Sequence, residues 1–73
     1  MKPLSELREG EWAVVKEIRG GHDFVRRLAE MGVSSGTRLR VVRGRGLMIV
    51  EVKGHRLMIG RGMVPRIMAE PAA

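Results

Sequence analysis

The sequence predicts a mainly β fold, a small five-stranded barrel with one docked α-helix. Three observations carry this prediction: an amphipathic helical segment that a glycine stops, an alternating strand directly after it, and short apolar stretches separated by glycines, of which the chain has 10. Short strands close best as a bent barrel, because closure hides the edges that an open sheet exposes. With 73 residues, residues 1–73 are expected to form a single domain around a simple core.

The first predicted strand covers residues 11–18. Alternation places Ala13 and Val15 on the core face and Trp12 on the opposite face. Ile18 reaches the core only after a bulge or a twist of the strand. The strand is therefore expected to carry Trp12 toward the outside.

The predicted helix follows at residues 24–31. Phe24, Leu28 and Met31 recur at positions i, i+4 and i+7 and form an apolar stripe. Asp23 is the expected N-cap, because its carboxylate can accept a backbone N–H of the first turn. One face of the helix therefore docks on the core.

The end of this helix carries a glycine signal. Gly32 stands where a left-handed residue would close the helix, and Val33 would then touch Leu28 in a Schellman motif. The segment Val33-Ser34-Ser35-Gly36 follows as a tight turn. Both serines thus have a role in a turn.

The remaining predicted strands are short and are separated by glycine-containing turns. Gly44-Arg45-Gly46 is short enough to force an antiparallel hairpin, and Lys53-Gly54-His55 makes the next turn. Residues 60–65 are expected to form a loop or one helical turn, and Pro71-Ala72-Ala73 has the character of a disordered tail. The strands are predicted at residues 37–43, 47–52, 56–59 and 66–70.

Composition limits the classes of function. The chain has no cysteine, which removes disulfides and thiol nucleophiles, and its formal net charge of +6 favours acidic partners. The longest apolar run, Leu47 to Val50, is too short to span a bilayer, and the start MKPLSELREGE lacks the apolar core of a signal peptide. The chain is therefore expected to be soluble and to stay inside the cell.

Apolar residues and glycines recur in a fixed order along essentially the whole chain. The chain contains, in this order, Leu4-x-x-Leu7-x-x-Gly10-x-x-Ala13-x-Val15-x-x-Ile18, Leu28-x-x-Met31-Gly32-Val33-x-x-Gly36-Thr37, Val50-x-Val52-x-Gly54, and Gly60-Arg61-Gly62-Met63 with Ile67. This ordered set resembles the ferrous iron transport protein A family, FeoA, and the segment ending in Gly36-Thr37 is its most telling part. One departure is the compact hairpin around Gly44-Arg45-Gly46-Leu47, which is often longer in the family, so partner contacts of that loop are not carried over.

The resemblance implies an SH3-like barrel of the bacterial cytosol that assists a membrane GTPase iron transporter, the ferrous iron transport protein B. It implies an accessory protein that is not an enzyme and needs no cofactor. Such a protein is a partner-binding module of ferrous iron uptake, and it reaches the membrane only through its partner. A related SH3-like domain forms the regulatory C-terminal part of iron-dependent repressors.

The residues themselves argue against two other classes. Ordinary SH3 domains bind polyproline ligands on tyrosines and tryptophans, and this chain has no Tyr and one Trp. The hydroxyl residues and the two histidines, His22 and His55, show no signature of a catalytic triad. Neither proline-rich peptide binding nor catalysis is expected.

Metal binding has three candidate residues. His22, Asp23 and Glu17 could lie near one another at the end of the first strand, and imidazole with carboxylates suits ferrous iron or zinc. A bound metal needs three or four converging ligands, and no pair here has the i, i+4 spacing of helical ligands. Solvated loop histidines are therefore the favoured interpretation, and iron is what the implied partner transports.

A basic SH3-like nucleic-acid-binding module is the alternative function. Single-strand binders place aromatic residues among the basic ones so that bases can stack, and only Trp12 is available, because Phe24 belongs to the helix core. A basic face that meets an acidic protein surface is favoured instead, with no specific nucleic acid expected. The basic residues concerned are Arg38, Arg40, Arg43 and Arg45.

The surface expected to contact the partner follows from strand alternation. If Val50 and Val52 face the core, Ile49 faces outward, and if Leu57 faces the core, Met58 faces outward. Six methionines suit an adaptable binding surface. The candidates for partner contacts are Trp12, Ile49 and Met58, ringed by Arg38, Arg40 and Lys53.

Overall fold

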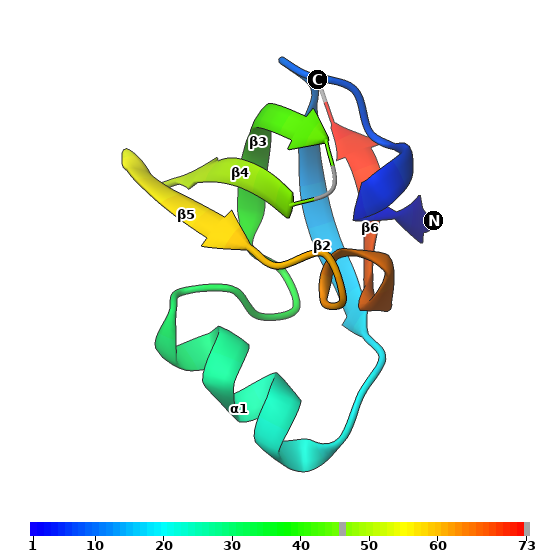
Figure 1. Cartoon of the computed structure of the whole chain (residues 1–73), viewed down its shortest axis with the longest axis vertical. Coiled ribbons are helices and arrows are strands. Elements are labelled where there is room, and N and C mark those ends of the chain that lie inside the picture. The colour runs from blue at the N-terminus through cyan, green and yellow to red at the C-terminus, as the bar shows by residue number, and fades with distance from the viewer. Residues whose placement is uncertain (46, 73) are drawn as a thin grey trace.

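The structure, a computed structural model, describes residues 1–45 and 47–72, in which six antiparallel strands form one curved sheet and one α-helix lies beyond one end of it (Figure 1). Two short 3-10 turns, η1 (Leu4–Glu6) and η2 (Val64–Arg66), connect parts of the sheet. The other elements are β1 (Lys2–Pro3), β2 (Trp12–Ile18), α1 (His22–Glu30), β3 (Arg38–Arg45), β4 (Leu47–Val52), β5 (His55–Ile59) and β6 (Ile67–Ala72).

The mainly β fold with one helix is confirmed, but the described residues contain six strands where the sequence predicted five. The additional strand is β1, in which Lys2 pairs with Ala69 and Pro3 pairs with Met68 of β6. A strand of two residues is too short to show alternation in the sequence. Its pairing is set by tertiary contact with β6.

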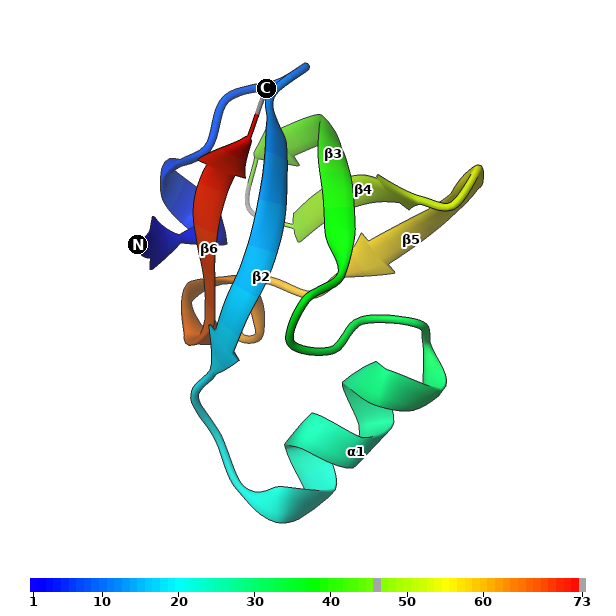
Figure 2. The ribbon, with the colours of Figure 1, turned by 180° about the vertical axis from the view of Figure 1, so that it is seen from behind.

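The sheet is curved but is not closed by hydrogen bonds as the predicted barrel would be. The strand order is β1-β6-β2-β3-β4-β5, so β1 and β5 are the two ends (Figure 2). In the described sheet β1 pairs with β6 alone, and the buried side chains of Leu4 and Val64 join the core from the 3-10 turns. The core is thus closed by side-chain packing, and β5 is an edge strand of the described sheet.

The helix begins earlier than predicted. It starts at His22, and Gly21 is the N-cap without a side-chain hydrogen bond, so the prediction of Asp23 as N-cap is wrong. Asp23 lies in the first turn, where a carboxylate interacts favourably with the helix dipole. There its Oδ1 accepts from Nη2 of Arg26 at 3.4 Å. The glycine N-cap leaves the helix start without the polar side chain that a sequence search relies on.

The end of the helix is as predicted. Gly32 has a φ of +94°, the conformation that glycine adopts without a steric penalty. The N–H of Val33 donates to the carbonyl of Leu28 at 2.8 Å, and the N–H of Gly32 donates to Ala29 at 3.0 Å. These two bonds are the Schellman motif, so the stop signal read from the sequence is confirmed.

The core follows the predicted alternation of the strands. Ala13 and Val15 are buried on β2 while Trp12 is exposed, and the register of β2 against β6 shifts between Val15 and Glu17, a bulge that lets Ile18 pack against the core. The largest fully buried side chains come from η1, the helix, the turn after it and the long strands: Leu4, Val15, Leu28, Val33, Leu39, Val41, Val50, Ile59 and Ile67.

The turns differ from the prediction in two places. β3 continues to Arg45, which pairs with Leu47, and the predicted turn residue Gly46 lies outside the described residues. β6 continues to Ala72, because Pro71 and Ala72 pair with β2. The prediction of a disordered tail is therefore wrong for these two residues, and Ala73 lies outside the described part. The sequence of the tail alone does not show that it pairs with β2.

The β4–β5 turn sets the geometry of the last hairpin. Lys53 has a φ of 51° and Gly54 a φ of 82°, and the flanking residues Val52 and His55 pair directly. Two consecutive residues with positive φ form a type I′ turn, which matches the twist of the strands. The hairpin is therefore tight and carries Lys53 at its tip.

Candidate interaction surface

Trp12 is the most prominent side chain of the predicted contact set. It begins β2, is 37% exposed, and lies opposite Arg40 of β3. The guanidinium carbon of Arg38 lies 4.7 Å from the centroid of the indole ring, and that of Arg40 lies 5.8 Å from it. Both arginines thus make cation–π contacts with one aromatic ring, and the ring is held at the surface in a defined position.

Arg40 is anchored on its other side by β4. Its Nη2 and Nε donate to Oε1 of Glu51 at 2.7 Å and 3.1 Å, and both side chains are partly buried. The register places Trp12 opposite Arg40 and Arg40 opposite Glu51, so the three side chains form one row across three strands. This row orders the guanidinium beneath the aromatic ring.

An apolar group lies beside this row. Ile49 of β4 pairs with Met58 of β5, and Met58 is 62% exposed. Leu47 is also exposed and lies two residues from Ile49, so it falls on the same side of the strand. Leu47 is not among the predicted contact residues, although the alternation that places Ile49 outward also places Leu47 outward.

All six predicted contact residues lie on or beside one side of the sheet. Lys53 is at the tip of the β4–β5 hairpin, where a shallow groove of about 360 Å³ is lined by Trp12, Arg38, Glu51, Lys53 and Gly54. The predicted set thus falls into a basic part around Trp12 and an apolar part around Met58. The outer face is made of Trp12, Arg38, Arg40, Leu47, Ile49, Lys53 and Met58.

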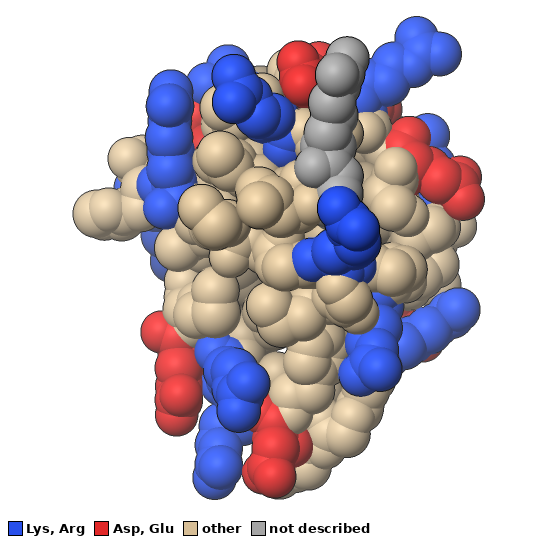
Figure 3. All heavy atoms as spheres, in the orientation of Figure 1, with Lys and Arg blue, Asp and Glu red and all other residues tan. Residues whose placement is uncertain are grey.

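Basic residues outnumber acidic ones in the chain. The chain carries 14 Lys and Arg residues against 8 Asp and Glu residues. On the side seen in Figure 3, the blue side chains of Lys and Arg are distributed around the molecule, with red acidic groups between them. This distribution on that side differs from the continuous basic stripe that typically tracks a nucleic acid backbone.

The three candidate metal ligands do not converge on one site. His22 and Asp23 are exposed in the first turn of α1, whereas Oε2 of Glu17 accepts from Nε of Arg19 at 2.8 Å. Across residues 1–45 and 47–72, no group of three or more His, Cys, Asp or Glu side chains is placed to hold a metal ion. These candidates therefore form no ligand set in the described part of the chain.

The hydroxyl residues after the helix have the turn role that the sequence predicts. Oγ1 of Thr37 accepts from the N–H of Ser34 at 3.1 Å, and Oγ of Ser35 donates to the carbonyl of Lys16 at 3.0 Å. These bonds tie the turn to β2 and to the start of β3.

The carboxyl group of Glu70 has a lowered pKa. The α-amino group of Met1 lies 2.8 Å from Oε1 of Glu70. Its hydrogen bond and its positive charge lower the pKa of the Glu70 carboxyl, and the charge of Lys16 adds to the effect. The contact fastens the start of the described chain to β6.

Within the described ranges, no helix is both long and apolar enough to cross a membrane.

Comparisons with known proteins agree on one family. A family model described as the FeoA domain matches residues 2–71. The chain is 41% identical over 73 residues to "Putative Fe(2+) transport protein A" of Methanocaldococcus jannaschii. The match covers 99% of this chain and 89% of that relative.

Two solved structures are similar over nearly the whole chain. An iron uptake regulatory protein (FeoA) has 35% identity and a TM-score of 0.89, and the match covers 97% of this chain and 96% of that one. The FeoA of Stenotrophomonas maltophilia, solved in complex with zinc and described as an SH3 domain protein, has 27% identity, a TM-score of 0.78, and coverage of 96% and 91%. The expectation of an SH3-like fold is thereby confirmed.

Proposed function

The chain belongs to the FeoA family, and on this premise we propose that it is a cytoplasmic accessory protein of ferrous iron uptake. The partner in this proposal is the cytosolic part of a membrane GTPase iron transporter, ferrous iron transport protein B, which the family resemblance implies. The family is a non-enzymatic accessory family, so the protein acts by binding. The membrane is reached only through the partner.

One observation carries the assignment of the binding surface. Trp12 and Met58 are large apolar side chains that stay exposed on the same side of the sheet, and arginines hold the indole in place. Exposed aromatic and methionine side chains are enriched at the centres of protein interfaces. A surface in which the anchor is already ordered loses less entropy on binding. These features support the outer face as the contact surface.

The charge of the outer face supports an acidic partner surface. Arg38 and Arg40 contact the ring of Trp12, Lys53 lines the same groove as Trp12, and the chain has a net charge of +6. Complementary charge increases the rate of association and fixes the orientation of the partners. The cytosolic partner is therefore expected to present acidic side chains around an apolar patch.

A non-catalytic binder can influence a GTPase in only one way at equilibrium. It must bind one conformational state of the transporter more tightly than another, so its maximal effect is set by the ratio of the two affinities. Any change in GTP hydrolysis should therefore saturate as the complex forms.

The proposal is tested by titrating the purified chain into the cytosolic domain of the transporter in a calorimeter, with GTP hydrolysis measured at each concentration. We expect saturable binding and a change in hydrolysis that follows the occupied fraction. The titration is repeated with and without ferrous iron, because binding that appears only with the metal would make the protein a metal sensor. Absence of binding to that domain would contradict the proposed partner.

A further inference from the structure

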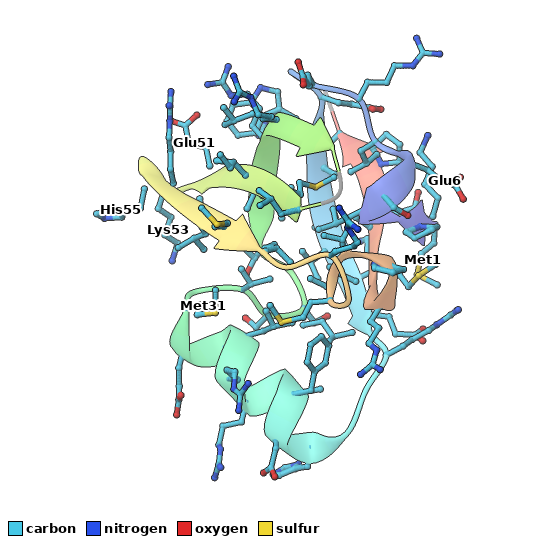
Figure 4. All side chains as sticks on the ribbon, in the orientation of Figure 1. Met1, Glu6, Met31, Glu51, Lys53 and His55 are labelled. Atoms are coloured by element: carbon cyan, nitrogen blue, oxygen red, sulfur yellow. The ribbon has the colours of Figure 1, made fainter. Side chains whose placement is uncertain are left out.

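A second concave site lies between the end of α1 and the β4–β5 hairpin, and of the outer-face residues only Lys53 lines it. This groove has a volume of about 340 Å³. Its apolar lining comes from Met31, Val52 and Leu57, and Met31 and Leu57 are only partly buried where they pack against the core. Figure 4 shows Met31 at the helix end below the hairpin that carries Lys53 and His55. The groove thus gives access to apolar side chains at the margin of the core.

The same groove runs beside a strand edge. β5 is the last strand of the sheet in the described residues, and its only strand partner there is β4. The turn at Lys53-Gly54 has two residues, so His55 is expected to form a hydrogen-bonded pair with Val52. The ladder then alternates, and the backbone groups of Arg56 and Met58 are directed to the edge. An extended segment can pair there without displacing any strand.

The basic side chains at the rim of the groove favour an acidic occupant. Lys53, His55 and Arg56 are exposed at the rim, and the groove lining contains no Asp or Glu among the described residues. Glu51, which lies opposite Arg56 on β4, is paired with Arg40. The side chains of Lys53 and Arg56 make no hydrogen bond or ion pair within the described part of the chain. An acidic side chain beside Arg56 on a neighbouring strand would form a favourable cross-strand pair.

We propose that the β5 edge and this groove bind an extended, acidic and apolar segment of a partner protein. The segment adds a strand to the sheet at Arg56 and Met58. Because side chains alternate along a strand, its apolar residues face the groove beside Leu57 and its acidic residues lie near Arg56. This site does not include Trp12, it shares Met58 with the outer face, and it needs no assumption about the transporter.

Charge makes a second copy of this chain the poorer occupant. Pairing of β5 with β5 would bring together two molecules that each carry a net charge of +6 and the same basic rim. Self-repulsion of this kind keeps proteins monomeric. Charged residues on an edge strand also discourage self-association in natural sheets. The segment that fits is therefore one with opposite charge.

The probe for this proposal is a synthetic seven-residue peptide in which glutamate alternates with valine and leucine. Its control is the same peptide with lysine in place of glutamate. Two-dimensional NMR of the labelled chain should show shifts of the β5 and Met31 signals with the glutamate peptide. Hydrogen exchange should slow at the amides of Arg56 and Met58, whereas those of Leu57 and Ile59, which the ladder already directs to β4, should change little.

Two variants separate the backbone from the charge. Met58→Pro removes the edge N–H, a change that an edge strand tolerates, and it should abolish peptide binding, while the matched Met58→Ala should retain it within about threefold. Arg56→Glu should weaken binding of the glutamate peptide about three- to tenfold and strengthen binding of the lysine peptide. If Met58→Pro fails to fold, Arg56→Glu still tests whether the glutamate peptide binds at β5.

The proposal would be overturned by an absence of shifts at millimolar peptide, by shifts confined to Trp12, Arg38 and Arg40, or by equal binding of the two peptides. Sedimentation of the chain without peptide provides the remaining outcome. A dimer that the Met58→Pro variant disrupts would show that a second copy occupies the edge, and this would also overturn it.

Discussion

The guanidinium of Arg38 lies over the indole of Trp12, with 4.7 Å between its central carbon and the ring centroid. The contact joins β3 to the exposed beginning of β2, and Arg40 approaches the same ring at 5.8 Å. Cation–π contacts of this kind contribute about 0.5–1 kcal/mol at exposed sites. Their main consequence here is that they hold the exposed indole of Trp12 in a defined position in the unbound protein.

The docking of the helix can be tested with two neighbouring substitutions. Leu28 is fully buried, so Leu28→Ala should lower the free energy of unfolding by about 2–5 kcal/mol. Arg27 is exposed, and Arg27→Ala should change it by no more than about 0.5 kcal/mol. Urea denaturation followed by circular dichroism measures both. Equal midpoints for the two variants would contradict the docking of α1 through Leu28.

The Schellman motif predicts a difference between two glycines. A Cβ added at Gly32 or at Gly62 would meet no atom within 4 Å, but Gly32 has a φ of +94° whereas Gly62 lies outside the left-handed region. Gly32→Ala should therefore destabilise the protein by about 1–2 kcal/mol, the cost of a left-handed conformation for an L-residue. Gly62→Ala should be nearly neutral. Thermal unfolding of the two variants gives the comparison, and equal stabilities would show that backbone conformation at Gly32 is unimportant.

The ion pair of Glu70 predicts a specific pH dependence for the chain that begins at Met1. The pKa of Glu70 is lowered by the α-amino group of Met1, so the group contributes stability above the pKa that it has in the unfolded chain. That contribution is lost as the pH falls through the lower pKa of the folded state. NMR titration of the side-chain carboxyl should place the pKa of Glu70 below the ordinary value of a glutamate. Adding Gly-Ser before Met1 should return the pKa toward that ordinary value, and a titration unchanged by the extension would exclude the contact.

The nucleic-acid alternative predicts a steep dependence on salt. If arginines of β3 bound a single strand, the log–log slope of the association constant against salt would be about −0.7 for each phosphate contacted. Arg40 is already paired with Glu51, and Arg38 lies over Trp12, which leaves the ring less accessible to bases. We expect no binding tighter than about 10 μM at physiological salt, weaker than a specific site gives. Fluorescence anisotropy with labelled RNA and DNA tests this, and sub-micromolar binding at 150 mM salt would favour the alternative.

The end of the helix could be predicted from the sequence because its signal is local. Gly32 and Val33 close the helix with their own backbone groups, and a glycine after an apolar stripe is sufficient to indicate this. The start was less accessible, since Gly21 caps the helix without a side chain. β1 and the end of β6 were missed for a different reason. Their pairing depends on neighbouring strands, which the residues Lys2 and Ala72 do not encode by any period of their own.

In the candidate site, too, locally encoded features could be predicted from the sequence, whereas contacts between strands could not. Strand alternation was enough to place Trp12 and Met58 outward, as the structure has them. The cross-strand relationships were not predictable, because the pairing of Arg40 with Glu51 depends on the register between β3 and β4, and that register shifts at a bulge after Val41. The groove beside β5 was likewise hidden, since it joins the end of α1 to a hairpin far along the chain.

The central claim is that the outer face binds the cytosolic domain of the transporter, and calorimetry with one double variant tests it most directly. Trp12→Ser combined with Met58→Ser removes both exposed anchors, and Arg27→Ser, on the helix, is the control. We expect the double variant to bind at least about 30-fold more weakly, the equivalent of one interface hot spot of about 2 kcal/mol. The control should bind within about twofold of the unmodified chain, and both variants should keep the NMR spectrum of a folded protein. A folded double variant that binds as tightly as the unmodified chain would contradict the claim.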